Sequence, residues 1–193
     1  KFDDFSSQKQ YSVDQAKNDW VLVIDSDEVV TEDLKKSILE VSDSAVFSAY
    51  EIPRLLFFLG KKVSHSGGID FPVRLFNRKK GKFSGAKVHE QVLIDGSVGR
   101  VSGFLEHYSY DSLDEYFRKF DRYTTIAAQA LHDRGAKPRP DKILLSFPVI
   151  FFKLYFLKLG ILDGLAGLLW CALSAWSPVV KYYKAYRLKV SVS

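Results

Sequence analysis

The stretch Trp20-Val-Leu-Val-Ile-Asp-Ser-Asp-Glu28 decides the fold class of this chain. Five apolar residues, most of them β-branched or bulky, end abruptly in a group of carboxylates. Such a run predicts a buried, parallel-type strand that ends at the carboxyl edge of a sheet. Thr31 is a good N-cap, and the acidic residues after it predict a helix over residues 31–41. Strand, acidic turn and helix together predict an α/β fold with a ligand site at this edge.

The rest of the first 136 residues predicts further strands and helices around this unit. Ser112 with Glu115 three residues later is a capping box, which predicts a helix over residues 112–131. The run Gly135-Ala-Lys-Pro-Arg-Pro140 then breaks the chain, so we expect one domain over 1–136 and a tail over 137–193. The remaining patterns predict a helix over 8–16, strands within 45–58 and over 72–76, 88–94 and 101–108, and turns at 60–62 and 77–82.

The tail predicts two helices, over residues 142–159 and 161–176. Its longest uncharged stretch, Gly164–Val180, has 17 residues, whereas a membrane-spanning helix needs about 20. The tail holds nine basic and two acidic residues, and its lysines stand among aromatic residues. These features favour helices that lie in the interface of an anionic membrane, with snorkelling lysines, over a spanning helix and over nucleic-acid binding.

Composition sets the remaining bounds. The 193 residues are 47% apolar with a net charge of +5, which excludes wholesale disorder. The single cysteine, Cys171, excludes a disulfide framework and a cysteine-rich metal site, and it favours a reducing compartment. The chain begins at Lys1 and contains no methionine. We therefore expect it to be a piece of a longer polypeptide.

Asp25 and Asp27 are the most distinctive chemical feature. Two carboxylates two residues apart at the end of a strand can face one divalent cation, directly or through its waters. Mg²⁺ and Mn²⁺ prefer oxygen ligands and often bridge them to the phosphates of a substrate. The alternative interpretation is an acidic turn that caps the next helix. Whether Asp25 or Glu28 accompanies Asp27 at a metal is open at this point.

Three other residues are candidates for chemistry. Glu90 is a candidate general base on a predicted strand, or else a surface carboxylate paired with Lys87 or Arg100. His107 is a candidate nitrogen ligand of the metal, although a buried histidine bonded to the backbone is more common. Arg74 lies inside an apolar strand, where we expect an exposed alternate position rather than a contact to phosphate or acceptor.

Several of these segments together resemble the inverting family 2 glycosyltransferases of the GT-A type. Asp19-Trp-Val-Leu-Val-Ile-Asp-Ser-Asp-Glu28 resembles their strand and metal motif. Arg74-Leu-Phe-Asn-Arg78 and Phe83-Ser-Gly-Ala-Lys-Val-His-Glu90 resemble their acceptor-side strands, and Leu105-Glu-His-Tyr-Ser-Tyr110 resembles the strand that closes the catalytic domain. In the tail, Lys158-Leu-Gly-Ile-Leu-Asp-Gly164 resembles the membrane-associating end of the lipopolysaccharide-core branch, the bacterial β-1,4-glucosyltransferase-like enzymes.

The resemblance implies an enzyme at the cytoplasmic face of the bacterial inner membrane, peripheral or monotopic. It implies transfer of a sugar, with inversion, from a nucleotide sugar to a glycan or lipid-linked acceptor of the cell envelope, similar to the lipopolysaccharide core. Asp27 would bind Mg²⁺ or Mn²⁺ at the diphosphate, with His107 as a further ligand. Asp25 would hold the ribose or metal-bound waters, and Glu90 would deprotonate the acceptor hydroxyl. Gln8 and Lys9 would line the donor side.

One departure from the family limits this expectation. The family's catalytic domain begins with a β-α-β portion that binds the nucleotide base, and no segment of this chain matches it. We therefore expect a partial GT-A sheet, a Rossmann-like mixed sheet followed by a helical tail. The isolated chain should be weakly active or inactive.

Two alternative functions stay open. One is a haloacid-dehalogenase-like phosphatase, with Asp25 as nucleophile and Asp27 as acid and base. The other is a non-catalytic module that docks on membranes through the tail.

Overall fold

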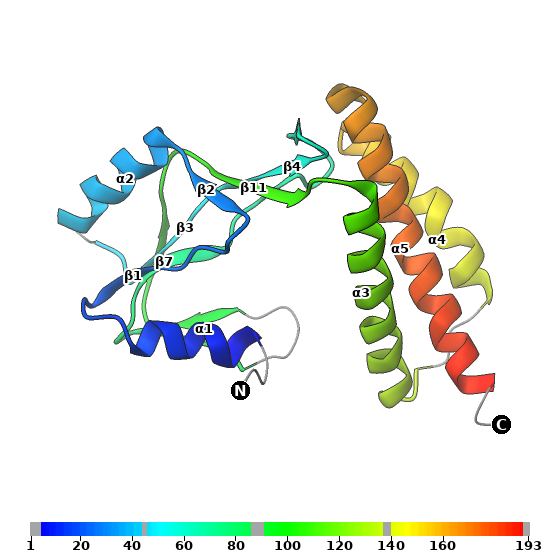
Figure 1. Ribbon diagram of the computed structural model, residues 1–193, viewed down its shortest axis with the longest axis horizontal. Coiled ribbons are helices and arrows are strands. Elements are labelled where there is room, and N and C mark those ends of the chain that lie inside the picture. Colours follow the sequence, from blue (N-terminus) through cyan, green and yellow to red (C-terminus); the bar gives the residue numbers. More distant parts are fainter. Residues whose placement is uncertain (1–4, 44–45, 86–90, 137–139, 191–193) are drawn as a thin grey trace. The chain divides into compact units, whose positions relative to one another are not determined.

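The computed structural model describes residues 5–43, 46–85, 91–136 and 140–190 (Figure 1). It has a mixed α/β architecture with small sheets and C-terminal helices. The chain forms two compact units, residues 1–55 with 70–107 and residues 56–69 with 108–193. The sequence predicts a domain boundary at residue 136, after the helix expected over 112–131. This helix lies in the second unit, together with the tail.

A mixed four-stranded sheet lies in the first unit. Its order is β1 (Trp20–Leu22), β7 (Val73–Asn77), β3 (Ala49–Glu51) and β10 (Val98–Arg100). β7 runs antiparallel to both β1 and β3, and β10 runs parallel to β3. The expected strand at Trp20 is therefore present, but the parallel pairing expected for it is not found among the described residues. An apolar run reports burial of a strand and carries no information on the direction of its neighbour.

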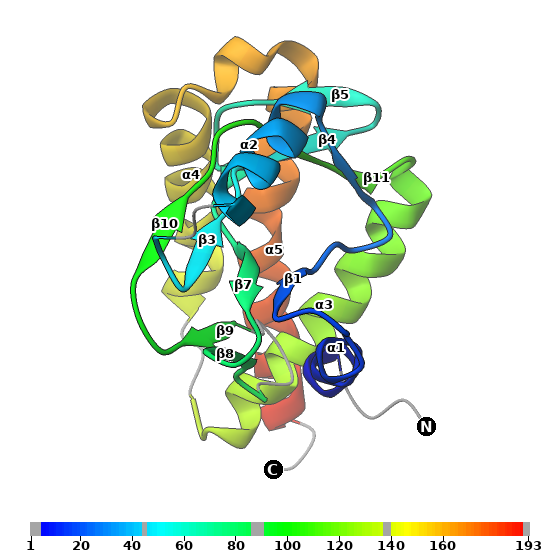
Figure 2. The same ribbon diagram turned by 90° about the vertical axis from the view of Figure 1, so that its left-hand side faces the viewer.

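Shorter elements complete this unit. β2 (Glu28–Val30) pairs antiparallel with the first half of β11 (Leu105–Tyr110), and β8 (Gly81–Phe83) pairs with β9 (Val92–Ile94). The two-residue strand β6 (Ile69–Asp70) precedes β7. Helix α1 (Phe5–Asp14) precedes β1, and α2 (Glu32–Asp43) follows β2 (Figure 2). The hydroxyl of Thr31 accepts a hydrogen bond from the Leu34 amide, so the expected N-cap of α2 is confirmed.

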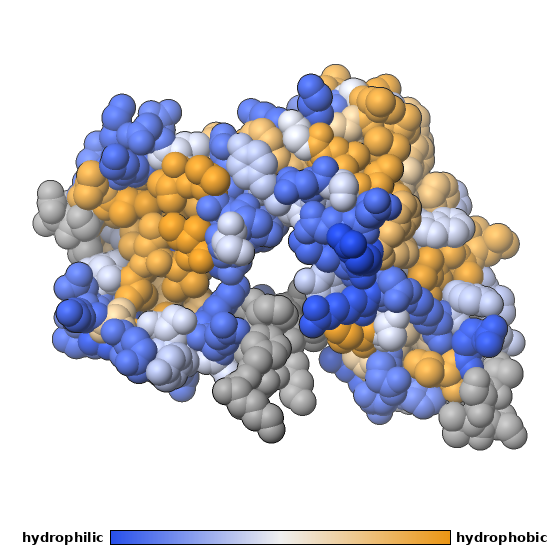
Figure 3. Space-filling model, in the orientation of Figure 1, coloured by the Kyte–Doolittle hydropathy of each residue, from blue (hydrophilic) through white to orange (hydrophobic). Residues whose placement is uncertain are grey.

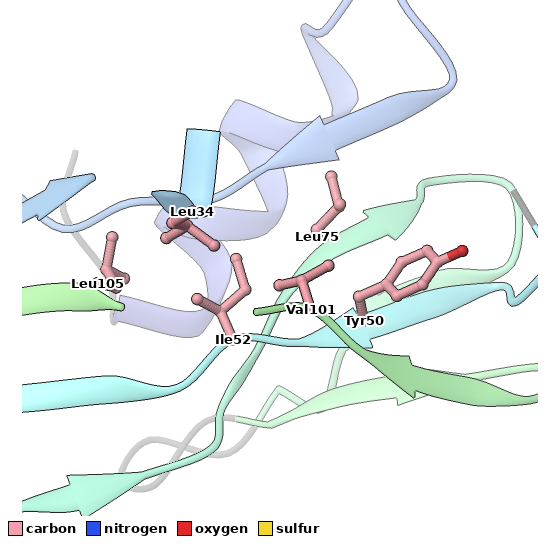
Figure 4. Close-up of a cluster of buried hydrophobic side chains, with 6 residues drawn as sticks. All are labelled: Leu34, Tyr50, Ile52, Leu75, Val101 and Leu105. Carbon is pink, nitrogen blue, oxygen red and sulfur yellow. The ribbon is translucent and has the colours of Figure 1, made fainter. Parts of the chain in front are cut away.

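The four-stranded sheet carries a core on each of its two faces. Neighbouring residues on one strand go to opposite cores, because side chains alternate along a strand: Leu75 packs on one face and Phe76 on the other. Leu34 of α2 covers the first face, and Val13 of α1 covers the second. Figure 4 shows the first core, whose buried members are Leu34, Tyr50, Ile52, Leu75, Val101 and Leu105.

The second unit consists of a hairpin, whose first strand begins two residues earlier in the first unit, and a set of helices. β4 (Arg54–Phe58) pairs with β5 (Lys61–Val63) through a turn at Leu59 and Gly60, which both have positive φ. The turn expected at 60–62 lies one residue earlier, because Lys61 and Lys62 belong to β5. The helices are α3 (Leu113–Asp133), α4 (Pro140–Phe152), a π-helical turn η1 (Lys153–Leu157), a 3-10 turn η2 (Gly160–Asp163) and α5 (Gly164–Val190).

Local sequence signals explain the helix ends in this unit. The Ser112 hydroxyl accepts a hydrogen bond from the Glu115 amide at 3.2 Å, and the Glu115 carboxylate accepts one from the Asp111 amide at 3.1 Å. The expected capping box at the start of α3 is thus confirmed. α5 continues to Val190, well beyond the end expected at residue 176, because Pro178 lies within it without ending it.

Candidate active site

The candidate site begins in the turn that joins β1 to β2. The Val23 amide donates to the Arg74 carbonyl at 2.9 Å, so pairing with β7 continues past the end of β1. The Asp25 amide then donates to the Glu28 carboxylate at 2.9 Å, and the Glu28 amide donates to the Asp25 carbonyl at 3.1 Å. These reciprocal bonds close the turn. As a result, the Glu28 carboxylate points into the protein.

Two arginines meet this inward carboxylate. The Glu28 side chain is fully buried, and its Oε1 accepts from Arg54 Nη1 at 3.0 Å and from Arg74 Nη2 at 2.5 Å. Arg74 Nη2 also donates to Asp25 Oδ2 at 2.7 Å. Arg54 is held from its other side by Asp70, which accepts two hydrogen bonds at 2.9 and 2.6 Å. The site therefore rests on a network of two guanidinium groups and three carboxylates.

The exposed position expected for Arg74 is wrong. The residue is only 7% exposed, because β7 lies between β1 and β3 and is covered on both faces. A buried guanidinium needs compensation by negative charge. Glu28 and Asp25 supply it from the turn after β1.

Asp25 is paired on both of its oxygens. Besides the bond from Arg74, its Oδ1 lies 2.9 Å from the ammonium of Lys9 on α1. Burial raises the pKa of Asp25, but the hydrogen bond from Lys9 and the charge of Arg74 outweigh it, so the pKa lies below its ordinary value. Asp25 is therefore ionised at neutral pH. The Asp25 side chain is 32% exposed, whereas that of Glu28 is fully buried, so Asp25 is the better candidate to accompany Asp27 at a metal.

Asp27 and His107 lie together, although 80 positions separate them in the sequence. Asp27 Oδ2 is 3.4 Å from His107 Nε2, and their side chains are 37% and 22% exposed. The register of β2 and β11 explains the contact, because His107 is paired directly with Glu28. The hydrogen bond from His107 lowers the pKa of Asp27 below its ordinary value, against an opposing effect of partial burial.

This pair provides one oxygen and one nitrogen donor next to solvent. Within the part of the chain that the structure describes, no group of three or more His, Cys, Asp or Glu side chains could hold a metal. Two protein donors suffice where substrate phosphates and water complete the shell, which is the usual arrangement for Mg²⁺ at nucleotides. A histidine nitrogen suits Mn²⁺ better than Mg²⁺.

A groove of about 430 Å³ runs along α1 and ends at Asp25. Lys9 and Asp25 lie at its lining, together with residues of α1 and the whole stretch from Trp20 to Asp25. Its volume is in the range of small-molecule sites. Of the two residues expected on the donor side, Lys9 lines this groove, whereas Gln8 is exposed on α1 and is not among the lining residues.

One expected residue cannot be placed, and two residues of the site were not expected. Glu90, the predicted base, lies outside the described residues, as does His89. Sequence reasoning missed Arg54 and Asp70 altogether. A signal existed, since Arg54 and Arg74 each place one charge at the start or middle of an otherwise apolar strand.

Comparison with known proteins gives relatives but no family model. No family model matches the chain. It is 27% identical over 198 residues to the lipopolysaccharide core biosynthesis glycosyltransferase LpsC of Rhizobium meliloti (strain 1021), covering 96% of this chain and 71% of that protein. It is 24% identical to an uncharacterized glycosyltransferase of Rickettsia typhi, covering 96% and 68%, and 25% identical to one of Rickettsia prowazekii, covering 84% and 60%. The relatives of this chain are thus glycosyltransferases.

Proposed function

We propose that this chain carries the metal and acceptor side of an inverting glycosyltransferase of the GT-A type. It would transfer a sugar from a nucleotide-sugar donor to a cell-envelope glycan acceptor similar to the lipopolysaccharide core. The similarity to named glycosyltransferases over nearly the whole chain supports the reaction class. The similarity to the lipopolysaccharide core biosynthesis glycosyltransferase of Rhizobium meliloti supports the class of acceptor.

The observation that carries the proposal is the Asp27–His107 pair, which follows the groove residue Asp25 in the same turn. The oxygen and nitrogen donors fit Mn²⁺ or Mg²⁺ if a diphosphate completes the coordination. When bound, the metal would stabilise the negative charge that develops on the departing nucleoside diphosphate. Asp27 contributes an ionised carboxylate to this site, because its pKa is lowered by His107.

The residues around this pair would fix the donor. Asp25 and Lys9 line the groove and are bonded to each other, so they offer a fixed acceptor and a fixed cation to polar groups of a nucleotide sugar. The buried network of Arg74, Glu28 and Arg54 holds the turn that bears both aspartates. A rigid support of this kind keeps catalytic groups in one geometry.

Glu90 would act on the acceptor. Its carboxylate would accept the proton of the attacking hydroxyl, while the hydroxyl oxygen bonds to the anomeric carbon and the bond to the diphosphate breaks on the opposite face. This sequence of events inverts the anomeric centre. The role of Glu90 rests on the resemblance, since the residue lies outside the described part of the chain.

Binding of Mn²⁺ tests the proposal without depending on turnover. We would titrate Mn²⁺ into the chain with UDP present and follow free Mn²⁺ by electron paramagnetic resonance. Asp27→Asn should weaken binding at least about tenfold, since it removes a charged ligand. Glu106→Gln is the matched control, because Glu106 precedes His107 on β11 and points to the opposite face. Equal Mn²⁺ affinity of wild type and Asp27→Asn would refute the metal site.

The phosphatase alternative is less well supported. It requires the Asp25 carboxylate to attack phosphorus as a nucleophile. Both oxygens of Asp25 are instead engaged by Lys9 and Arg74. The relatives described above are glycosyltransferases.

A further inference from the structure

The outer face of α4 and η1 is apolar and exposed. Apolar side chains follow one another at helical spacing along this face, and in α4 no residue is buried. Large apolar surfaces of this kind on a folded protein mark interaction sites. The exposed residues that define the face are Leu144 at 77%, Leu145 at 55%, Val149 at 62%, Phe152 at 54%, Phe156 at 47% and Leu157 at 68%.

The turn after η1 continues this surface. Leu159, Ile161, Leu162 and Leu165 are between 47% and 71% exposed, although they lie in or next to the 3-10 turn η2. Figure 3 shows the resulting apolar surface on the part of the second unit that contains η2 and the start of α5. We call α4, η1 and η2 together the apolar flank.

Positive charge predominates on the apolar flank. Lys142, Lys153 and Lys158 are exposed along it, and Asp141 is exposed in the first turn of α4. Between Lys142 and the C-terminus the sequence contains a single acidic residue, Asp163. That carboxylate is only 6% exposed and is turned inward, where it accepts hydrogen bonds from the amides of Ser64 and His65 and contacts His65 Nδ1. The exposed surface therefore offers cations and apolar groups together.

The flank is held firmly on the rest of the second unit. The Ser66 amide donates to the Lys158 carbonyl at 3.1 Å, and the Ser66 hydroxyl donates to the Leu154 carbonyl at 3.2 Å. Gly160 is buried, with the Ser66 hydroxyl and the Cys171 sulfur so near that an added Cβ would meet both. Leu157 and Leu162 are thus exposed in an ordered turn.

Helix α5 packs against α4 on one side and makes polar contacts to α3 on the other. α4 and α3 each pack along α5, as Figure 1 also shows. Phe147 of α4 contacts Trp176, with ring centroids 5.8 Å apart. Towards α3, the Lys184 ammonium lies 2.7 Å from Asp121 Oδ1 and bonds to the hydroxyls of Thr124 and Thr125.

The charged helix α3 beside α5 argues against a transmembrane role for α5. The segment Gly160–Leu188 is long and apolar enough to cross a membrane by length and composition. If its uncharged part, residues 164–180, did so in this packing, the charges next to Tyr116 on α3 would enter hydrocarbon, because Tyr116 packs in one cluster with Trp170. Ionised groups are costly there. A helix pair with one apolar and one charged outer surface instead suits the boundary between water and lipid.

We propose that the apolar flank docks on an anionic lipid bilayer. Its leucines and phenylalanines insert at the level of the acyl boundary, and its lysines contact the lipid phosphates. α5 lies parallel to the membrane and does not span it, while α3 stays in water. This inference goes beyond sugar transfer and does not depend on it.

Vesicle flotation tests the proposal. The chain is mixed with vesicles of phosphatidylcholine, with or without phosphatidylglycerol, and floated through sucrose. It should float only with the anionic vesicles and less at high salt, since lysine contacts are screened. Leu157→Ser/Leu162→Ser should weaken partitioning at least about tenfold, because two exposed apolar side chains lose their burial in lipid.

A matched variant controls for general loss of apolar surface. Leu39→Ser/Leu93→Ser removes two leucines that are 59% and 51% exposed in the first unit, and it should float like wild type. Lys153→Glu/Lys158→Glu is a second test that leaves the apolar residues in place, and it should abolish flotation with anionic vesicles. Unchanged flotation of both flank variants would overturn the proposal. Resistance of the bound chain to alkaline carbonate extraction would also overturn it, since that result indicates a spanning helix.

Discussion

The buried arginine of β7 gives the most direct test of how the candidate site is built. Arg74→Leu removes a guanidinium whose side chain is 8% exposed and whose partner Glu28 is fully buried. Breaking a buried ion pair by removing one partner costs about 3–5 kcal/mol. Two features reduce this. Arg54 and Lys9 still compensate the two carboxylates, and the Nε of Arg74 is buried without a hydrogen-bond partner among the described residues.

The expected loss of stability is therefore about 2–4 kcal/mol, because removal of a buried unsatisfied donor recovers about 1 kcal/mol. Hydrogen exchange measured by mass spectrometry gives the free energy of opening for the amides of β1 and β7, and so reports on the first unit alone. Lys79→Leu is the matched control. It removes an ion pair to Asp19 of similar length, 2.8 Å, whose side chains are 68% and 46% exposed, and it should cost less than about 1 kcal/mol.

A double-mutant cycle completes the experiment. Glu28→Leu alone leaves Arg74 without its buried partner, whereas Arg74→Leu/Glu28→Leu removes both charges together. The double variant should be more stable than the sum of the single losses predicts, by about 1–3 kcal/mol. Additive losses, or a loss below about 0.5 kcal/mol for Arg74→Leu, would refute a buried pair at this position.

Two further predictions concern titratable groups. The carboxyl of Asp27 should titrate below its ordinary pKa of 3.8 in a carbon-detected NMR experiment, and His107→Gln should raise that midpoint because it removes the largest lowering influence. The pKa of Asp27 is lower in the folded than in the unfolded chain. The stabilisation from this pair is therefore present above pH 3.8 and is lost as the pH falls through the folded pKa. A pKa of Asp27 that His107→Gln leaves unchanged would contradict the contact. Cys171 is fully buried, and burial raises the pKa of its thiol, so Ellman's reagent should react with it at pH 8 only after denaturation. Rapid reaction of the native chain would show that α5 does not pack against Ser66.

The elements that the sequence predicted are those with strong local signals. An unbroken apolar run predicts the strand at Trp20, and the capping box at Ser112 predicts α3. β10 was missed because Val98-Gly-Arg100 contains no apolar run and a central glycine. Its pairing with β3 is a long-range contact, which no local pattern contains.

The candidate site follows the same division. Asp25 and Asp27 could be singled out because they end a strand, and His107 because it lies on another predicted strand. The arginine network could not be predicted, because its pairs are far apart in the sequence. Glu28 is 26 positions from Arg54 and 46 positions from Arg74. Alternation along a strand assigns a charge to the exposed face, and only the sheet order reveals that both faces of β7 are covered.

The inward carboxylate of Asp163 has a consequence for synthesis on the ribosome. It closes the loop at Ser64 and His65 through hydrogen bonds that span 98 and 99 residues. At 5–20 residues per second, about 5–20 s pass between the emergence of this loop and that of its partner. During this interval the loop after β5 lacks the hydrogen bonds to Asp163. The second unit therefore completes its fold after the sheet residues of the first unit have been synthesised.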